Sequence, residues 1–237
     1  VKSAPSPVKT PTPAPKVAQP GEDTPMVPEL DVSLPATPQI IGGGWTRVKA
    51  GYRPIALGRA EVEGLIRSTG RFHQVDPNLS LAVAEAESSF DTNAVSKDGH
   101  HSKGLFQLLD STGREMQGLL GVQEAYDPFD APQNAFLGIG YLKRLFEMFG
   151  KETVLTRDLT THPARTADDL EKLAVAAFNA GQGAVARAQR KALLAGEDPG
   201  SFRAIEKHLP AQTRAYVGRV FEYRLAHQQN DPSQMTA

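Results

Sequence analysis

Two glutamates, Glu85 and Glu87, are the residues of this sequence whose type and placement first suggest chemistry. They lie near the end of a predicted helix that breaks after Phe90. Leu79 and Val83 recur in that helix at helical spacing, and Glu87 continues their row at i+8 and i+4. Glu85 falls on the opposite side of the same helix. The pattern therefore predicts that Glu87 is at the edge of the buried face.

A carboxyl group pressed against apolar surface resists ionisation, so its pKa rises. A glutamate that stays protonated near neutral pH can act as a general acid. The alternative interpretation of Glu87 is structural: a partly buried glutamate held by main-chain groups at the end of its helix. The helical spacing alone leaves both interpretations open.

A polar loop at 91–103 follows this helix, and it closes on the sequence GLFQ at 104–107. The loop contains His100 and His101. Adjacent histidines point in different directions on any regular backbone and make a poor metal-binding pair. We therefore interpret both as exposed loop residues and expect no metal site. Gly104 is predicted to allow close approach of the backbone.

The composition divides the 237-residue chain. The first 45 residues hold ten of the eighteen prolines and few large apolar side chains. Such a segment cannot bury a core, so residues 1–45 are predicted to form a disordered, proline-rich tether. Residues 46–231 are enough for one domain with a sizeable core. Residues 232–237 are predicted to be a disordered tail.

Charge and cysteine content exclude several classes of protein. The formal net charge is −1, which gives no electrostatic reason to expect binding to nucleic acid or to an anionic membrane. The absence of cysteine excludes disulfides and thiolate metal sites. No apolar run approaches the roughly 18 residues that span a bilayer. The chain starts at Val1 rather than a methionine, and we expect that an export signal or anchor has been removed upstream.

Helical periodicity dominates the domain, and no strand pattern competes with it, so the predicted fold class is all-α. Gly70 is expected to end the first helix, and residues 151–168 are expected to be polar and irregular. Gly181 is expected to end the helix that precedes it. Helices are predicted at 57–69, 77–90, 110–120, 131–149, 170–179, 184–194, 202–207 and 213–228.

Several short sequences resemble the motifs of soluble lytic transglycosylases, the SLT-type, lysozyme-like enzymes that cut peptidoglycan. They occur in that family's order: ESSF at 87–90, NAVS at 93–96, GLFQ at 104–107, AFNAG at 177–181, and LPAQT at 209–213 followed by YV at 216–217. The resemblance implies a lysozyme-like helical domain. Three features depart from the family pattern: Phe178 stands for a tyrosine, Gln212 stands for a glutamate, and the loop at 91–103 is longer than usual.

The resemblance also implies a function. Most glycosidases use two carboxylates, but this sequence offers only Glu87 in a suitable place, which fits a substrate-assisted exception. Glu87 would serve as acid and then base in cutting between N-acetylmuramic acid and N-acetylglucosamine, leaving a 1,6-anhydro end. No metal or organic cofactor is implied. Polar positioning is expected from Ser96, Gln107 and Asn179, and Tyr141 and Tyr216 are expected to line the substrate cleft.

Two other functions are compatible with the same residues. One is hydrolysis by a goose-lysozyme-like muramidase, which would need a second acid to position water. The other is a non-catalytic peptidoglycan-binding module of an envelope or phage assembly. In each case the expected partner is the glycan strand of peptidoglycan, in the periplasm or cell envelope. The tether could additionally connect the domain to envelope machinery.

Overall fold

A computed structural model describes residues 57–97 and 99–231 of the chain. The predicted tether at 1–45 and tail at 232–237 lie outside the described residues, so both stay predictions. The elements are α1 (Arg59–His73), α2 (Pro77–Ser88), α3 (Asp110–Leu119), α4 (Ala131–Phe149), β1 (Thr153–Thr156), β2 (Leu159–Thr161), α5 (Ala167–Ala180), α6 (Gln182–Leu194), α7 (Phe202–Glu206) and α8 (Ala211–Gln229). The predominance of helix confirms the predicted fold class.

Short polar side chains begin three of the helices. Asp76, Asp130 and Thr166 each accept a hydrogen bond from a main-chain N–H two or three residues later, at 2.9, 2.8 and 3.1 Å. Proline follows Asp76 directly and occurs in the first turn after Asp130, where its missing N–H costs no helical hydrogen bond. A cap of this kind stabilises a helix by about 1 kcal/mol. Sequence therefore fixes where α2, α4 and α5 begin.

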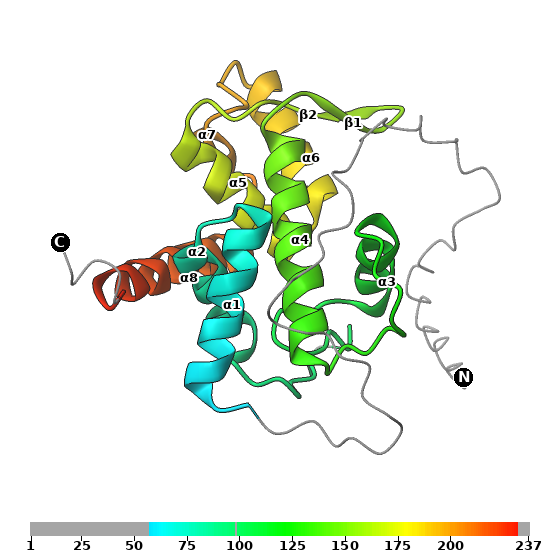
Figure 1. Cartoon of the computed structure of the whole chain (residues 1–237). Coiled ribbons are helices and arrows are strands. Elements are labelled where there is room, and N and C mark those ends of the chain that lie inside the picture. The colour runs from blue at the N-terminus through cyan, green and yellow to red at the C-terminus, as the bar shows by residue number, and fades with distance from the viewer. Residues whose placement is uncertain (1–56, 98, 232–237) are drawn as a thin grey trace, which may run out of the picture. The chain divides into compact units, whose positions relative to one another are not determined.

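Helix α4 runs through the middle of the domain, with α1 on one side and α3 on the other (Figure 1). Helix α2 is buried along most of its length, between α1 and α8. The fully buried large side chains come mainly from α2, α4 and α5, and they include Leu79, Leu81, Leu137, Ile139, Leu142, Leu145 and Leu173. These apolar stripes supply the core that holds the end of α2 in place.

The C-terminal helix α8 packs along α2 and also contacts α5. Arg224 of α8 joins all three helices. Its Nε and Nη2 lie 2.8 and 2.7 Å from Oδ2 of Asp76, and its Nη1 donates to Glu171 of α5. Because Asp76 is also the N-cap of α2, this cluster fixes the start of α2 against α8.

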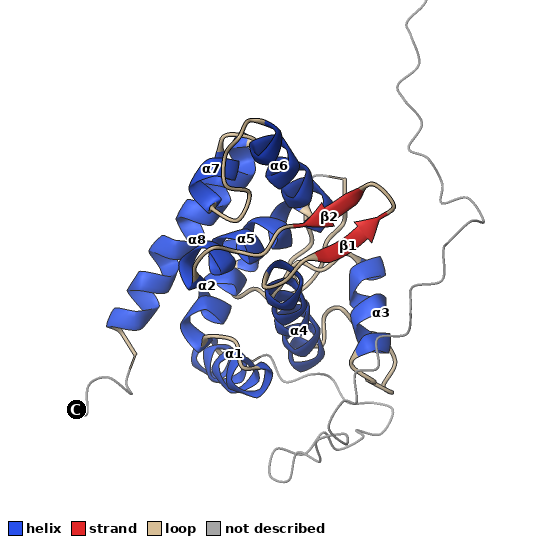
Figure 2. Cartoon of the chain, turned by 90° about the horizontal axis from the view of Figure 1, so that it is seen from above, coloured by secondary structure: helices blue, strands red, loops and turns tan. Residues whose placement is uncertain are grey.

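The expectation of irregular structure at 151–168 was wrong in part. Strands β1 and β2 form an antiparallel hairpin, in which Thr153 pairs with Thr161 and Thr156 with Leu159 (Figure 2). The side chain of Thr161 is buried, and its Oγ1 donates to the carbonyl of Met148 at 3.0 Å. The strands are short and rich in threonine, so they lack the apolar alternation that identifies a strand in a sequence.

The prediction that Gly70 ends the first helix was also wrong. Helix α1 continues to His73 and ends at Gln74, which adopts a left-handed conformation with φ 56°. Gly70 is buried, and a Cβ there would lie 3.0 Å from Oγ of Ser80 and 3.2 Å from the carbonyl oxygen of Val75. The glycine therefore allows α1 to pack closely on α2.

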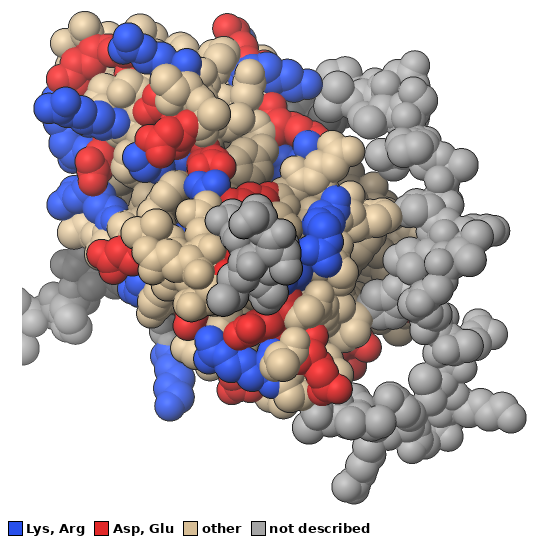
Figure 3. All heavy atoms as spheres, turned by 60° about the vertical axis from the view of Figure 1, so that its left-hand side comes forward, with Lys and Arg blue, Asp and Glu red and all other residues tan. Residues whose placement is uncertain are grey.

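None of the helices in residues 57–97 and 99–231 combines the length and the apolar character that crossing a bilayer requires. On the face that Figure 3 shows, basic and acidic side chains are interspersed rather than gathered into patches of one sign.

Candidate active site

Glu87 occupies the last turn of α2, which ends at Ser88. The next two residues, Ser89 and Phe90, both have positive φ, at 53° and 68°. The chain therefore turns sharply away directly after Glu87. Tyr216 of α8 lies opposite, and its hydroxyl donates a hydrogen bond of 2.6 Å to Oε1 of Glu87.

The environment of Glu87 favours the protonated carboxyl. Although part of the residue is exposed, its carboxyl group is enclosed by protein atoms. Burial raises the pKa of Glu87 from its ordinary value to about 7, against smaller lowering effects of the Tyr216 hydrogen bond and the positive charge of Arg219. The partial exposure of Glu87 confirms its predicted position at the edge of the buried face. At neutral pH the group can both donate and accept a proton.

Tyr216 is buried, with a side chain suited to remain a hydrogen-bond donor. Burial, together with the adjacent charge of Glu87, raises the pKa of Tyr216 well above its ordinary value. The phenol thus stays protonated over the range in which Glu87 titrates. Tyr216 was predicted to line the substrate cleft, which stays a prediction, and the structure shows it as the direct hydrogen-bond partner of Glu87.

The other two acids considered for the site are engaged elsewhere. Oε2 of Glu85 lies 2.8 Å from Nε2 of His227, and its Oε1 lies 3.4 Å from Arg59. Asp91 is exposed, and its Oδ1 accepts the main-chain N–H of Asn93 at 2.9 Å. Neither arrangement provides a second carboxyl beside Glu87.

Hydrogen bonds tie the segment at 104–107 to the end of α2 and to α4. Oγ of Ser88 donates to the carbonyl of Leu105 at 2.9 Å. Oδ1 of Asn134 accepts the N–H of Phe106 at 2.8 Å, and its Nδ2 donates to the carbonyl of Lys103 at 3.1 Å. Neither side chain was predicted from the sequence. Ser88 belongs to the ESSF motif, but the only signal for Asn134 is a polar residue within an apolar helix.

Gly104 meets the prediction of close backbone approach. Its φ is +74°, and a Cβ there would lie 2.2 Å from the carbonyl oxygen of Pro128 and 2.5 Å from Nδ2 of Asn134. No other residue fits this position without movement of the backbone.

The amide of Gln107 is used to hold the same loop together. Its Nε2 donates to the carbonyls of Ala94 and Gly104 at 3.0 and 2.9 Å, and its Oε1 accepts from Oγ of Ser102 at 3.2 Å. Ser96 closes the neighbouring turn, where its Oγ accepts the N–H of Ser102 at 3.0 Å. These contacts support a structural role for Gln107 and Ser96, and their binding to substrate stays a prediction.

His100 and His101 are exposed, as interpreted from the sequence. Among residues 57–97 and 99–231, no group of three or more His, Asp and Glu side chains is arranged to hold a metal ion.

Tyr141 of α4 is partly buried. Its hydroxyl donates to Oε1 of Gln182 at 3.1 Å, and burial raises its pKa to about 12. Its ring centre is 5.4 Å from that of Phe178, which replaces the tyrosine of the family motif. Asn179 is exposed near the end of α5, and Gly181 ends that helix with φ 80°, as predicted. Gln182, just past that glycine, was missed by the sequence analysis.

A chain of contacts leads from the end of α2 to Tyr141, but it does not bring all of the predicted site residues together. Ser88, next to Glu87, bonds the carbonyl of Leu105. The following ring, Phe106, lies 6.4 Å from Phe178, which in turn packs on Tyr141. Of the predicted site residues, Glu87 and Tyr216 are joined by a direct hydrogen bond.

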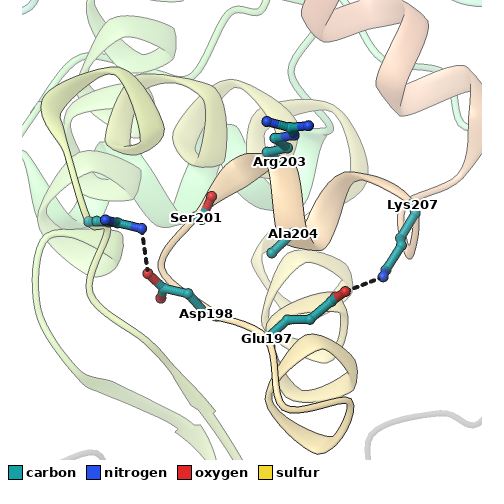
Figure 4. A pocket seen from close by; sticks show the side chains of 7 residues that line it. Glu197, Asp198, Ser201, Arg203, Ala204 and Lys207 are labelled. Carbon is teal, nitrogen blue, oxygen red and sulfur yellow. Dashed lines mark hydrogen bonds and ion pairs between the residues drawn. The ribbon is translucent and has the colours of Figure 1, made fainter.

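Two surface depressions do not include Glu87 in their lining. One, of about 380 Å³, is lined by Arg165, Glu197, Asp198, Ser201, Arg203, Ala204 and Lys207, and in Figure 4 Glu197 and Lys207 point toward one another. The other, of about 440 Å³, lies between α5, α7 and α8. In the first, Lys207 pairs with Glu197 and Arg165 with Asp198. Neither depression contains a residue predicted for the site.

The Transglycosylase SLT domain family matches residues 64–197, which is more than half of the chain. The chain belongs to this family. Similar proteins include "Membrane-bound lytic murein transglycosylase F 1" of Alkalilimnicola ehrlichii, 33% identical over 150 residues, and "Membrane-bound lytic murein transglycosylase F" of Desulfosudis oleivorans, 35% identical over 147 residues. These matches cover 60% and 62% of this chain but 25% and 28% of the relatives.

Solved structures show the same fold as this SLT domain. An inactive mutant of the lytic transglycosylase Slt of Pseudomonas aeruginosa matches 70% of this chain and 24% of that protein, with TM-score 0.55 and 23% identity. The 70 kDa soluble lytic transglycosylase of Escherichia coli matches 71% of this chain and 24% of that protein, with TM-score 0.52 and 19% identity. The lysozyme-like helical fold that the motifs implied is thus confirmed.

Proposed function

We propose that this SLT domain is a lytic transglycosylase. It cuts the β-1,4 bond between N-acetylmuramic acid and N-acetylglucosamine in peptidoglycan without consuming water, and it leaves 1,6-anhydro ends. The names of its relatives support murein as the substrate class. The observation that carries the proposal is the enclosed carboxyl of Glu87, hydrogen-bonded to Tyr216 and with its pKa raised to about 7.

The reaction needs one group that gives a proton and then takes one. Protonated Glu87 donates to the glycosidic oxygen as the bond to C1 of the muramyl residue breaks. The N-acetyl group of that residue stabilises the cationic centre, which is the substrate's own contribution. The resulting Glu87 carboxylate removes the proton of the C6 hydroxyl, whose oxygen attacks C1. Glu87 is then protonated again, and no water has been used.

Tyr216 supports both halves of this cycle. Its hydroxyl fixes Oε1 of Glu87 in the protonated state and donates a charge-assisted hydrogen bond to the carboxylate that forms. Ser96 and Gln107 hold the neighbouring loop, and with Asn179 they are proposed to position the sugars. Tyr141 is proposed to line the substrate path.

A hydrolytic muramidase is less well supported, because Glu85 and Asp91 are engaged away from Glu87. The proposed location is the periplasm or cell envelope, where peptidoglycan is found. A link to envelope machinery through residues 1–45 remains a hypothesis.

The proposal is tested by digesting purified peptidoglycan with the wild-type chain, Glu87→Gln and Glu85→Gln. Glu85→Gln is the matched control, since it makes the same change on the same helix without touching Tyr216. We expect release of soluble fragments by the wild type and the control, and a loss of at least about a thousandfold with Glu87→Gln. Equal release by all three would reject Glu87 as the acid. Binding without release would indicate a binding module.

A further inference from the structure

Arg219 places a positive charge at the surface beside the Glu87–Tyr216 pair. It lies three residues after Tyr216, one turn along α8, and its guanidinium carbon is 5.5 Å from the centre of the Tyr216 ring. Tyr216 is buried, whereas Arg219 is exposed. The charge reaches the carboxyl of Glu87, whose pKa it lowers. The guanidinium is thus accessible to solvent and close to the reacting group.

Two other arginines packed around α2 are already neutralised by protein carboxylates. Arg224 binds Asp76 and Glu171, and Arg59 binds Glu63 and Glu85. Arg219 forms no ion pair with a carboxylate of residues 57–97 or 99–231. An arginine that no carboxylate of the described residues neutralises, beside a candidate catalytic acid, is suited to bind an anionic ligand.

We propose that Arg219 binds a carboxylate of the peptidoglycan substrate next to the bond that is cut. This inference rests on the proposed function, which places a muramyl residue at Glu87. The O3 substituent of that residue is a lactyl group, and the carboxylate of this group is free when no peptide is attached. When a stem peptide is attached, that peptide carries the carboxylates.

The chemistry of arginine fits this role. A guanidinium presents parallel N–H donors that match both oxygens of a carboxylate. The guanidinium carbon lies over the Tyr216 ring, 5.5 Å from its centre, and this contact restricts the side chain, which reduces the entropy lost on binding. An anion bound at Arg219 would therefore anchor the sugar whose C1 is attacked.

The test measures binding to glycan strands in a Glu87→Gln background, so that no cleavage occurs. Three strand preparations are compared: with intact stems, with stem carboxylates converted to amides, and with stems removed to leave free lactyl groups. The added changes are Arg219→Gln, Arg219→Lys and the control Arg203→Gln, an exposed arginine on α7 that lines the surface depressions.

We expect Arg219→Gln to weaken binding of carboxylate-bearing strands about tenfold, with a smaller loss for Arg219→Lys. Amidated strands should bind equally to the protein with Arg219 and to the Arg219→Gln variant. If binding depends on Arg219 for intact strands alone, the bound carboxylate belongs to the stem peptide. If binding of stripped strands depends on Arg219, the bound carboxylate belongs to the lactyl group. Unchanged binding in every case, or an equal loss with amidated strands, would overturn the proposal.

A parallel digestion by the otherwise wild-type chain separates the two claims. Cleavage with binding that does not depend on Arg219 rejects only the role of Arg219. Binding that depends on Arg219, without any cleavage, supports the carboxylate site and rejects the proposed lytic activity.

Discussion

Oη of Tyr216 lies 2.6 Å from Oε1 of Glu87, although 129 positions separate the two residues. The contact exists because α8 packs along α2, and Arg224 fixes the two helices together through Asp76. The hydrogen bond opposes the effect of burial on the pKa of Glu87 without cancelling it. The pair therefore holds the carboxyl near the midpoint of its titration at neutral pH.

Replacing Tyr216 by phenylalanine tests this relationship. The change removes a hydrogen bond that lowers the pKa of Glu87, so that pKa should rise. Because the acid must be protonated, activity should fall above about pH 7 in the wild type, and this alkaline limb should move to higher pH in the variant. We also expect kcat to fall about tenfold, since the carboxylate loses its donor. An unchanged pH profile would separate Tyr216 from the titration of Glu87.

The stability of Glu87→Gln should depend on pH relative to wild type. A carboxyl whose folded pKa is raised from 4.5 to about 7 is protonated in the folded chain and ionised in the unfolded chain between those values. Wild-type stability is therefore lost as pH rises through this window, and the penalty is complete above it. Glutamine has no such penalty.

With allowance for solvent screening, we expect Glu87→Gln to gain about 2 kcal/mol over wild type on going from pH 4 to pH 8. Urea unfolding at both pH values measures the difference. A constant difference between the two proteins would mean that Glu87 titrates normally.

Gly104→Ala should disrupt the loop that faces the end of α2. The new Cβ would lie 2.2 Å from the carbonyl oxygen of Pro128, at a positive φ that alanine disfavours. We expect a loss of about 2–4 kcal/mol in the free energy of unfolding and reduced activity. Gly64→Ala is the matched control, because it is exposed in α1 with nothing within 4 Å of its added Cβ. That control should be neutral or stabilising by up to about 1 kcal/mol.

Arg224→Met should weaken the attachment of α8. It leaves the carboxylates of Asp76 and Glu171 partly buried and unpaired, at a cost of about 2 kcal/mol after allowance for their exposure. Chemical unfolding measures the loss, with Arg203→Met as the control for an exposed arginine. A loss no larger than that of the control would show that α8 is held by apolar packing alone.

Much of the local structure could be predicted from the sequence. Asp76 and Thr166 start their helices by hydrogen bonds within three residues, and Gly181 ends one by its own conformation. The helical row that contains Leu79 and Val83 also placed Glu87 correctly. These features depend on neighbours in the chain, which is why spacing and residue type reveal them.

The features that the sequence did not reveal depend on partners distant in the chain. Gly70 has the residue type of a helix end, but its role comes from contact with Ser80 on the next helix. The hairpin at 153–161 is held by the buried hydroxyl of Thr161 rather than by an apolar face. Tyr216 could be assigned to the site from its motif, but only the packing of α8 on α2 shows that it bonds Glu87.

The most direct test of the central claim is the mass of the fragments released from peptidoglycan in water enriched in heavy oxygen. If Glu87 directs the C6 hydroxyl to C1, the new muramyl ends are anhydro forms, one water lighter than hydrolytic products, and they carry no label. Reducing ends that contain one heavy oxygen would mean that water is the nucleophile. That result would contradict the proposed mechanism and identify the domain as a hydrolase.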